Sequence, residues 1–316
     1  MTNLTTCIAT LRKHPHIVNK NEIARTYENL GDTVAPGKYS GKQNKKIRLG
    51  DDTAAIMQED GSYLLFASEG IISDFLENDP WFAGYSAIMV NISDICAMGG
   101  LPMAVTDTIY TMDAEQSKEV WNGMLAASKA YNVPIVGGHT CYDSKQQSLS
   151  VAIVGKATES LLTSFDAQPE ECILLAMDMN GSYYKDYPFW NSSTTSEEKK
   201  LQENLTLLYR IANEKLAACC KDVSMGGIIG TLLMLLHTAK VGAQINLEDI
   251  QKPNNVSWEK WLSSFPSYGY LLTCSKKNAK SIQSIFKENA ISCQIIGEVT
   301  DSQELWLKYE QENIKF

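Results

Sequence analysis

The longest helical pattern of apolar residues in the chain runs from Asp79 to Pro102. Apolar side chains recur there with i, i+3, i+4, i+7 spacing, at Tyr85, Ile88, Met89, Ile92, Ile95 and Cys96. Asp79 can cap the helix, with Pro80 at the first helical position, where a missing N–H costs nothing. Two glycines and Pro102 end the pattern. We therefore predict one long helix around which the rest of the chain is organised.

Asn91 and Asp94 lie on another face of this helix. Residues three positions apart are neighbours on a helical surface. A carboxamide and a carboxylate placed together on a largely apolar helix have two interpretations. They form either a solvated strip beside a core or part of a polar site.

Strand-like and helical patterns alternate through the rest of the first half. The strand-like segments are 47–57, 62–71, 102–112, 133–140 and 148–157, and a second helix is predicted over 115–131. This order of strands and helices is typical of an α/β domain, which closes here near Ala157.

The second half repeats this mixture after an irregular insertion over 180–195, which is polar and aromatic. Thr195–Glu198 is a plausible capping box for a helix that runs to about Cys219. A strongly apolar helix follows the turn after Asp222. Further strands are predicted over 171–179, 242–250, 268–275 and 293–299, with a helix over 281–290.

The segment before the first strand combines a short helix around Asn21–Leu30 with a loop over 31–46. This loop is rich in Gly, Pro and Lys, which is typical of a flexible segment. It is either a solvated linker or a basic flap over a phosphate, with Lys42, Lys45 and Lys46 as the contacts. We divide the chain into 1–46, a first domain over 47–160 and a second over 161–316.

Composition limits the possible functions. The chain has 316 residues and a net charge of −9, which argues against a broad nucleic-acid-binding face. An acidic protein that handles phosphates usually does so through bound cations and backbone N–H groups. No apolar run reaches the length of about 18 residues that a membrane span requires. No signal peptide is evident, and the eight cysteines are scattered, so we expect a cytoplasmic protein without disulfides.

Carboxylates stand at the ends of several predicted elements. Asp51 and Asp52 follow a glycine at the edge of a strand, and two adjacent carboxylates cannot both be buried without a cation. Mg²⁺ prefers one or two carboxylates together with water and substrate phosphates. Glu69, Asp107 and Asp222 occupy comparable positions. The alternative interpretation of each residue is an ordinary position in a surface turn or at the end of a strand.

Glycine turns supply a second kind of candidate. Gly137 and Gly138 are predicted to form a glycine loop at the end of a strand, before His139, and they would let the backbone approach a ligand closely. Ser224 can cap the following helix, and Gly226 and Gly227 at its start make a phosphate cradle possible. Walker, GxGxxG, HExxH and GxSxG motifs are absent.

Four segments, in this order, resemble the AIR synthetase (PurM-like) superfamily: GDDTAAI, NISDICAMGGLP, IVGGHT and KDVSMGG. The superfamily includes thiamine-monophosphate kinase, selenophosphate synthetase, aminoimidazole ribonucleotide synthetase and the hydrogenase-maturation protein HypE. The resemblance covers roughly residues 47–300 and is strongest in NISDICAMGGLP. In detail the chain looks most similar to the bacterial "AIR synthase-like" subgroup.

The resemblance implies a two-domain α/β fold, of mixed α+β character. An N-terminal ATP- and Mg-binding domain would pair its sheet with that of a second subunit, and a C-terminal α/β domain would follow. The implied protein is a cytoplasmic homodimer that uses ATP and Mg²⁺. It either phosphorylates a small-molecule acceptor or activates one of its oxygen or amide groups.

Residue by residue, the resemblance assigns Asp51, Asp52, Asp94 and Asp222 to Mg²⁺, with Glu69 assisting. Asn91 and Gly138 match positions that line the nucleotide site. We expect Gly137, Ser224, Gly226 and Gly227 to contribute to nucleotide binding. His139 and Asp94 are the candidate catalytic residues, with His139 contacting phosphate or substrate.

Three departures set the chain apart from thiamine-monophosphate kinases. Glu69 and His139 stand where those enzymes have aspartate, and Met225 replaces a second aspartate. The chain also lacks the reactive N-terminal cysteine setting of selenophosphate synthetase. A true thiamine-monophosphate kinase and a catalytically silent nucleotide-binding subunit are the alternatives. The insertion from Tyr183 to Trp190 lines the substrate site or forms a surface loop.

Overall fold

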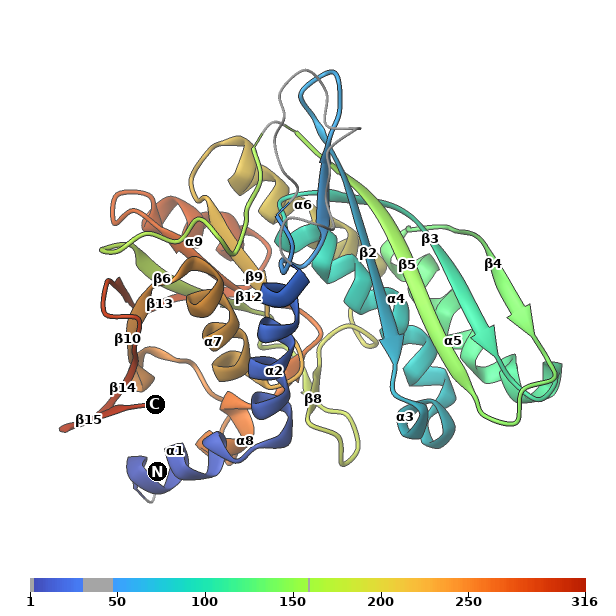
Figure 1. The fold of residues 1–316 in the computed structure, drawn as a ribbon, viewed down its shortest axis with the longest axis horizontal. Helices are drawn as coiled ribbons and strands as arrows, with labels where there is room; N and C mark the ends of the chain where they lie inside the picture. The colour runs from blue at the N-terminus through green and yellow to red at the C-terminus, as the bar shows by residue number, and fades with distance from the viewer. Residues whose placement is uncertain (1–2, 31–47, 159) are drawn as a thin grey trace.

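The computed structural model of the chain describes residues 3–30, 48–158 and 160–316. They form two large β-sheets and a small one of three strands. The two large sheets lie side by side, with helices between and outside them (Figure 1). The first sheet spans residues 54–157 and the second spans residues 172–315. The predicted α/β fold with two sheet-based halves is therefore confirmed, whereas the boundaries at 46 and 160 stay predictions. Lys42, Lys45 and Lys46 lie outside the described residues.

The first sheet has five strands in the order β1-β2-β5-β3-β4. Only the β3–β4 pair of this sheet is parallel in the described chain; the other neighbours are antiparallel. The strands are β1 (Ala54–Met57), β2 (Tyr63–Ile71), β3 (Leu101–Tyr110), β4 (Ile135–Cys141) and β5 (Ser148–Ala157). Helices α4 (Pro80–Ala97) and α5 (Ala114–Tyr131) lie on one side of it, and the short α3 (Ser73–Asn78) leads into α4 (Figure 1).

The two faces of this sheet differ because strand side chains alternate. On β5, Leu149, Val151 and Ile153 are buried in the core that α4 and α5 complete. On the opposite face, Phe66 is 47% exposed and Val136 is 64% exposed. This face of the first sheet therefore exposes large apolar side chains, and the described residues leave it uncovered.

The second sheet has seven strands in the order β15-β14-β10-β13-β6-β12-β9. The strands are β6 (Cys172–Met177), β9 (Cys219–Asp222), β10 (Gly242–Asn246), β12 (Gly269–Cys274), β13 (Ser292–Thr300), β14 (Leu305–Tyr309) and β15 (Glu312–Lys315). All six residues of β6 and of β12 are buried, as expected for a strand covered on both faces. This sheet is the centre of the second half.

Helices cover the second sheet on both faces. Alternate side chains of β6 join two cores, one shared with α4, α6 (Glu198–Asn213) and α9 (Ala279–Glu288). The other core contains α1 (Leu4–Arg12), part of α2 (Pro15–Leu30), α7 (Gly227–Ala239) and α8 (Trp258–Leu262). The insertion contributes β7 (Ser182–Tyr183) and β8 (Phe189–Asn191) to a small sheet, ordered β11-β8-β7, whose third strand is β11 (Phe265–Pro266). A 3-10 turn, η2, spans Leu247–Asp249.

Helix α4 is the element that both halves share. It contacts β2, β3 and β5 of the first sheet, β9 of the second sheet, and helices α5 and α6. Most of its residues are buried, Asn91 and Asp94 among them, so the solvated-strip interpretation of that pair is wrong. A Cβ at Gly84 would lie 2.1 Å from the Val120 carbonyl oxygen, and one at Gly123 would lie 1.9 Å from that of Trp81. These two glycines let α4 and α5 approach closely.

Several predicted local features are corrected by the structure. Asp79 occupies the N-cap position of α4 but makes no capping hydrogen bond; its carboxylate pairs with Lys185 instead. The capping box before α6 is not formed, because the N-cap is Glu197. The first strand is shorter than predicted, which leaves Asp51 and Asp52 in the loop before β1. Within the described residues, no helix is long and apolar enough to cross a bilayer.

We predict that Gly84→Ala and Gly123→Ala each lower the free energy of unfolding by about 1–3 kcal/mol, because an added methyl group forces α4 and α5 apart. Gly70→Ala is the matched control, since nothing lies within 4 Å of a Cβ there. Urea titration of the three variants measures the effect. If Gly84→Ala and Gly70→Ala unfold at the same denaturant concentration, the close approach of the helices is not a constraint.

Candidate active site

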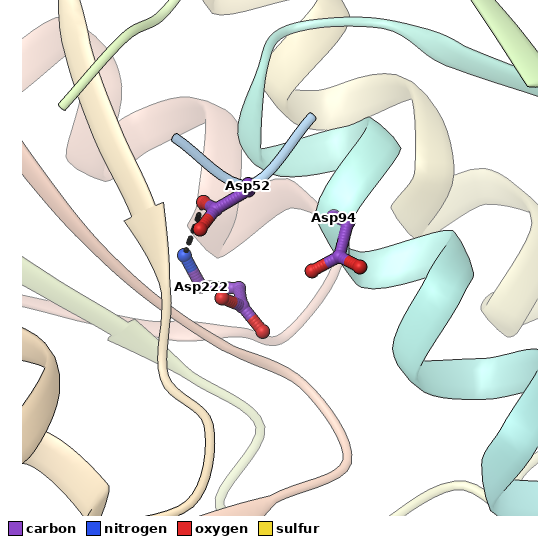
Figure 2. A group of neighbouring side chains, drawn as sticks. All are labelled: Asp52, Asp94 and Asp222. Atoms are coloured by element: carbon purple, nitrogen blue, oxygen red, sulfur yellow. Dashed lines mark hydrogen bonds between the residues drawn. The ribbon is translucent and has the colours of Figure 1, made fainter. Parts of the chain in front are cut away.

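Three aspartates from distant parts of the chain meet where the two halves join. Asp52 comes from the loop before β1, Asp94 from the middle of α4 and Asp222 from the end of β9. Each offers a carboxylate oxygen, and the three oxygens lie within 4.8 Å of one another. Figure 2 shows the three side chains converging on one space. The structure thus brings together three of the five predicted metal ligands.

Hydrogen bonds fix the loop that carries the first of these carboxylates. Asp51 Oδ2 accepts a hydrogen bond from Ser164 N at 2.9 Å, and Asp51 Oδ1 accepts one from Asp52 N at 3.0 Å. Asp52 Oδ2 accepts one from Asp222 N at 3.3 Å, the bond drawn in Figure 2. Asp51 therefore positions Asp52, and Asp52 ties the first half of the chain to β9.

Two lysines accompany the carboxylates. Lys221 forms a buried ion pair with Asp52. Lys20, on α2, donates a hydrogen bond from Nζ to Ser224 Oγ at 2.7 Å. It reaches the site because α2 packs against α7. A charged residue from the N-terminal helices thus belongs to the same site as the aspartates.

The cluster contains too few positive charges to balance its carboxylates. Burial raises the pKa of Asp222 to about 7, and the Asp52 carboxylate contributes. Burial and Asp52 likewise raise the pKa of Asp51 to about 6. The pKa of Asp94 lies well above its usual value, through burial first and then through Asp222 and Glu69. Carboxylates whose ionised forms are disfavoured in this way would be stabilised by a cation.

The lysines respond in opposite directions to the same surroundings. Burial lowers the pKa of Lys20, although Asp222 partly offsets that effect. Burial also opposes the charge of Lys221, but the carboxylates of Asp52, Asp51 and Asp222 outweigh it and raise its pKa. At the pocket rim, removal of water raises the pKa of Glu69, while Lys20 acts against this.

The atoms of the cluster fit a divalent cation. Asp94 Oδ2 is buried and has no hydrogen-bond partner, which is costly for an ionised oxygen. Oxygen donors are the ligands that Mg²⁺ prefers, and it commonly takes only one or two protein carboxylates. Asp52, Asp94 and Asp222 are therefore the residues that could hold such an ion.

A pocket with a volume of about 370 Å³ opens onto this cluster. Its charged end contains Asp51, Asp52, Glu69, Asp94, Asp222, Lys20 and Lys221; Ser224 and Met225 also line it. The rest of its wall is largely apolar, with Ile71, Ile72, Phe75, Phe82, Met89, Val90, Phe189, Met234 and Phe265 among the lining residues. Five carboxylates thus face two ammonium groups at one end of an otherwise apolar pocket.

A second pocket of about 260 Å³ lies against the same loop. It shares Gly50, Asp51, Asp52 and Glu69 with the first pocket and extends to Arg48, Phe66 and Ser68. The carboxylates therefore stand between two spaces, one lined mainly by apolar groups and the other reaching the uncovered face of the first sheet.

Other predicted site residues lie away from the pocket in the single chain. Asn91 is fully buried inside the fold, where its Nδ2 donates to the Ala87 carbonyl oxygen at 2.8 Å. Gly137, Gly138 and His139 lie within β4, not in a loop after it, at the sheet edge opposite β1. Their assignment to a nucleotide, and that of His139 to catalysis, stays a prediction.

The start of α7 also differs from expectation. Its N-cap is Gly226 rather than Ser224, and Ser224 instead accepts the hydrogen bond from Lys20. A Cβ at Gly227 would lie 2.4 Å from the Ser263 carbonyl carbon, and one at Gly226 would lie 3.3 Å from the His16 carbonyl oxygen. Both glycines are explained by packing, so their role as a phosphate cradle stays a prediction.

Sequence reasoning did not single out Lys20 or Lys221. A signal existed for Lys221, because it directly precedes Asp222 in a segment that begins with two buried cysteines. No local signal exists for Lys20, which only the packing of α2 brings to the site. Of the remaining carboxylates, Asp107 is buried on β3, and neither of its side-chain oxygens has a hydrogen-bond partner.

Comparison with known proteins identifies the class of protein that this fold and site define. The sequence model "AIR synthase related protein, N-terminal domain" matches residues 50–157, and "AIR synthase related protein, C-terminal domain" matches residues 180–310. The chain belongs to the AIR synthase related family.

Two relatives illustrate the range of the family. An uncharacterized protein of Synechocystis sp. is 44% identical over 271 residues, which are 85% of this chain and 84% of that protein. A thiamine-monophosphate kinase of Buchnera aphidicola is 27% identical over 294 residues, which cover 83% of this chain and 89% of that enzyme.

Solved structures with the same fold include three of different function. AaThiL complexed with AMPPCP and TMP aligns with a TM-score of 0.64 and 19% identity, over 84% of this chain and 91% of that one. The structure of a HypE-HypF complex aligns with a TM-score of 0.68 and 17% identity, over 92% of this chain and 98% of that one. Thermotoga maritima PurL complexed with ATP aligns with a TM-score of 0.69 and 14% identity, over 92% of this chain and 50% of that one. At these identities the likeness establishes the fold, and it confirms the predicted two-domain PurM-like architecture.

The raised pKa values of Asp51 and Asp222 predict how stability depends on pH without metal. Between the ordinary pKa of a carboxyl group and these raised values, the folded protein binds more protons than the unfolded chain. Its stability therefore falls as the pH rises through that window. From about pH 5 to about pH 8, we expect the melting temperature in EDTA to fall by several degrees more in the wild type than in Asp222→Asn.

Differential scanning calorimetry measures this difference, with the exposed Asp301→Asn as the matched control. The control should keep the wild-type dependence on pH. Equal slopes for the wild type and Asp222→Asn would show that repulsion within the cluster does not limit stability.

Proposed function

We propose that the protein is an ATP- and Mg²⁺-dependent enzyme that transfers a phosphoryl group to, or activates, an oxygen or amide group of a small-molecule acceptor. The observation that carries this proposal is the buried convergence of Asp52, Asp94 and Asp222, with an unpartnered oxygen on Asp94. Phosphoryl transfer depends on positioning and charge neutralisation more than on covalent catalysis. A pocket without a described nucleophile–base pair but with clustered carboxylates suits that requirement.

In this proposal Asp52, Asp94 and Asp222 hold Mg²⁺, with Asp51 and Glu69 assisting. Bound Mg²⁺ supplies charge neutralisation for the phosphates of ATP. Lys221 keeps Asp52 in place through their ion pair. Asp51 keeps the loop in place through Ser164 N. Lys20 provides a further positive charge beside Ser224, at the start of the turn into α7.

The reaction balances with ADP as the leaving group. The acceptor oxygen forms a bond to the terminal phosphorus of ATP. The bond from that phosphorus to the bridging oxygen breaks, and ADP leaves with the electron pair. Where the acceptor is an alcohol, its proton passes to solvent water.

We further propose that the enzyme is a cytoplasmic homodimer. The uncovered face of the first sheet supports this, because Phe66 and Val136 expose apolar surface that a second copy could cover. Gly137, Gly138 and His139 would then reach a nucleotide through the partner's sheet, since β4 lies far from the carboxylates of its own chain. Their predicted roles are compatible with the fold only in such an assembly.

A catalytically silent nucleotide-binding subunit is a second candidate. Met225 lines the pocket at the position where the resemblance places a metal-binding aspartate, so one ligand is replaced by a thioether. Tight ATP binding with no turnover of any acceptor would favour this candidate. Thiamine-monophosphate kinase activity, suggested by the relative of that name, is tested directly with thiamine monophosphate as the acceptor.

Asp94→Asn is predicted to abolish Mg²⁺-dependent nucleotide binding while the chain stays folded. A ligand that binds only the folded protein stabilises it by about 2.7 kcal/mol at about 100 times its Kd. We therefore expect a non-hydrolysable ATP analogue with Mg²⁺ to raise the melting temperature of the wild type and of Asp301→Asn, but not of Asp94→Asn. Without Mg²⁺ the increase should vanish in all three. An equal increase in Asp94→Asn would remove the metal assignment.

Lys20→Met is predicted to weaken binding of the Mg²⁺–ATP analogue by about tenfold, because a hydrogen bond to a charged group contributes more than a neutral one. Methionine keeps most of the side-chain length and removes the charge. Isothermal titration calorimetry compares it with Lys13→Met, an exposed lysine at the end of α1. If the Kd of Lys20→Met equals that of the wild type, Lys20 serves only to hold α2 in place.

A further inference from the structure

The apolar end of the 370 Å³ pocket has an aromatic wall, which we define as Phe75, Phe82, Phe189 and Phe265. These rings come from α3, α4, β8 and β11. Phe75 and Phe189 have their centroids 5.2 Å apart, and Phe189 meets Phe265 edge-on at 6.0 Å. Such spacings are those of stabilising aromatic pairs. Phe82 and Asp94 lie twelve residues apart on α4, which is about 18 Å along the helix, so the aromatic wall and the carboxylates line separate parts of the pocket.

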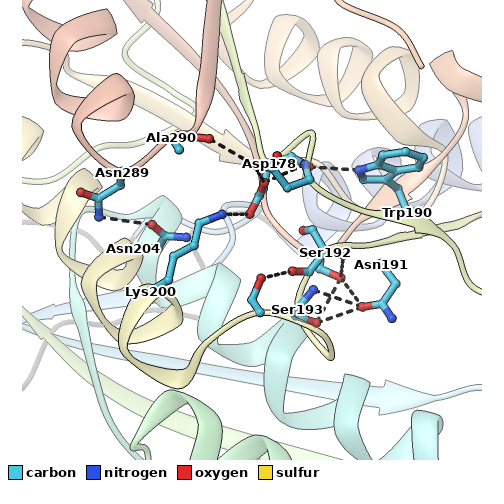
Figure 3. A network of polar contacts seen from close by, with 12 residues as sticks. Asp178, Trp190, Asn191, Ser192, Ser193, Lys200, Asn204, Asn289 and Ala290 are labelled. Carbon is cyan, nitrogen blue, oxygen red and sulfur yellow. Dashed lines mark hydrogen bonds and ion pairs between the residues drawn. The ribbon is translucent and has the colours of Figure 1, made fainter. Parts of the chain in front are cut away.

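The aromatic wall is held rigidly from behind. The polar contacts of Figure 3 anchor the insertion that carries Phe189: Trp190 Nε1 donates to the Asp178 carbonyl oxygen at 3.0 Å, and Lys200 pairs with the Asp178 carboxylate at 2.8 Å. On the other side, Tyr184 stacks on Phe82 with centroids 3.7 Å apart. The predicted alternative of a surface loop for this insertion is therefore wrong in part, because Phe189 faces the pocket.

Charge is confined to the opposite end. Among the described lining residues, the two cationic side chains are Lys20 and Lys221, and both stand at the carboxylates. A phosphate or carboxylate at the aromatic wall would lose its water without gaining a cationic partner, and the hydroxyl groups of Ser86 and Ser267, which also line the pocket, would not neutralise its charge. A flat apolar group would instead gain from burial against the rings.

We propose that this pocket binds the acceptor, and that the acceptor has a flat, uncharged body against the aromatic wall and its reacting oxygen at the carboxylates. This inference rests on the proposed function and specifies its substrate class. The volume of about 370 Å³ suits one small ring system, since ligand pockets commonly measure about 300–1,000 Å³. The 260 Å³ pocket beside Arg48, across the same carboxylates, is left for the nucleotide.

The test uses a matched pair of probes, 2-naphthalenemethanol and 6-(hydroxymethyl)-2-naphthoate, with binding measured by calorimetry in the presence of Mg²⁺. The second probe keeps the hydroxyl group and adds a carboxylate on the far ring, which the proposed pose places at the aromatic wall. We expect the neutral alcohol to bind the full-length protein at least about tenfold more tightly than the naphthoate. Phe189→Ala should weaken binding of the neutral alcohol by about tenfold. Phe316→Ala, which lies outside the pocket lining, is the matched control.

A second variant keeps the test decisive if Phe189→Ala loosens the fold. Ile72 lines the apolar end and is 58% exposed, so Ile72→Lys should fold normally. It places an ammonium group at the apolar end and should reverse the preference, so that the naphthoate binds more tightly than the neutral alcohol. Circular dichroism and melting temperature are recorded for every variant.

Three results would overturn the inference. They are a wild-type preference for the naphthoate, alcohol binding that neither variant alters, and displacement of the alcohol by adenosine, which would make the aromatic wall the nucleotide's own subsite. The thermal shift of the wild type with Mg²⁺ and the ATP analogue is scored separately. A shift combined with any of these results leaves the proposed function standing and removes only the acceptor class.

Discussion

Repulsion among buried carboxylates is the constraint on which this structure depends. Asp52, Asp94 and Asp222 bring oxygens within 4.8 Å of one another with too few positive charges nearby. Folding alone would not favour such a cluster, because each ionised group loses water and meets like charges. The cluster persists since the elements that carry it are fixed by apolar packing elsewhere. Sites that deviate from the most stable arrangement in this way are usually functional.

Helix α4 provides most of the apolar packing that holds the cluster in place. It lies in the core that joins both sheets, so Asp94 cannot turn toward solvent without disturbing the surrounding packing. The close contact with α5, which Gly84 and Gly123 permit, fixes the position of α4 relative to the first sheet. Hydrogen bonds from Ser164 N to Asp51 and from Asp222 N to Asp52 then bring the loop and β9 to the helix. The site is thus assembled by tertiary contacts rather than by any one motif.

This explains which features could be predicted from the sequence. The α4 helix was predictable because periodicity, a proline and glycines all agree over that segment. Asp52 and Asp222 were predictable because each borders an apolar strand, and Asp94 because it is a charged residue within an apolar helix. Lys20 was not, since nothing near it in the sequence indicates that α2 packs on α7. Gly137 and Gly138 were placed in a loop because glycine is common there, whereas pairing of β4 with β3 keeps them in a strand. Family resemblance fixed the fold but not the contacts made by these side chains.

The position of Lys20 affects the charge of the pocket. It lies before both matched family segments, which begin at residues 50 and 180, yet its ammonium group contacts Ser224 beside Met225. An aspartate at position 225 would add a further negative charge to a cluster that already lacks cations. With methionine there and a lysine supplied by α2, the same region gains positive charge without a bound ion. The N-terminal helices therefore contribute to the electrostatics of the pocket.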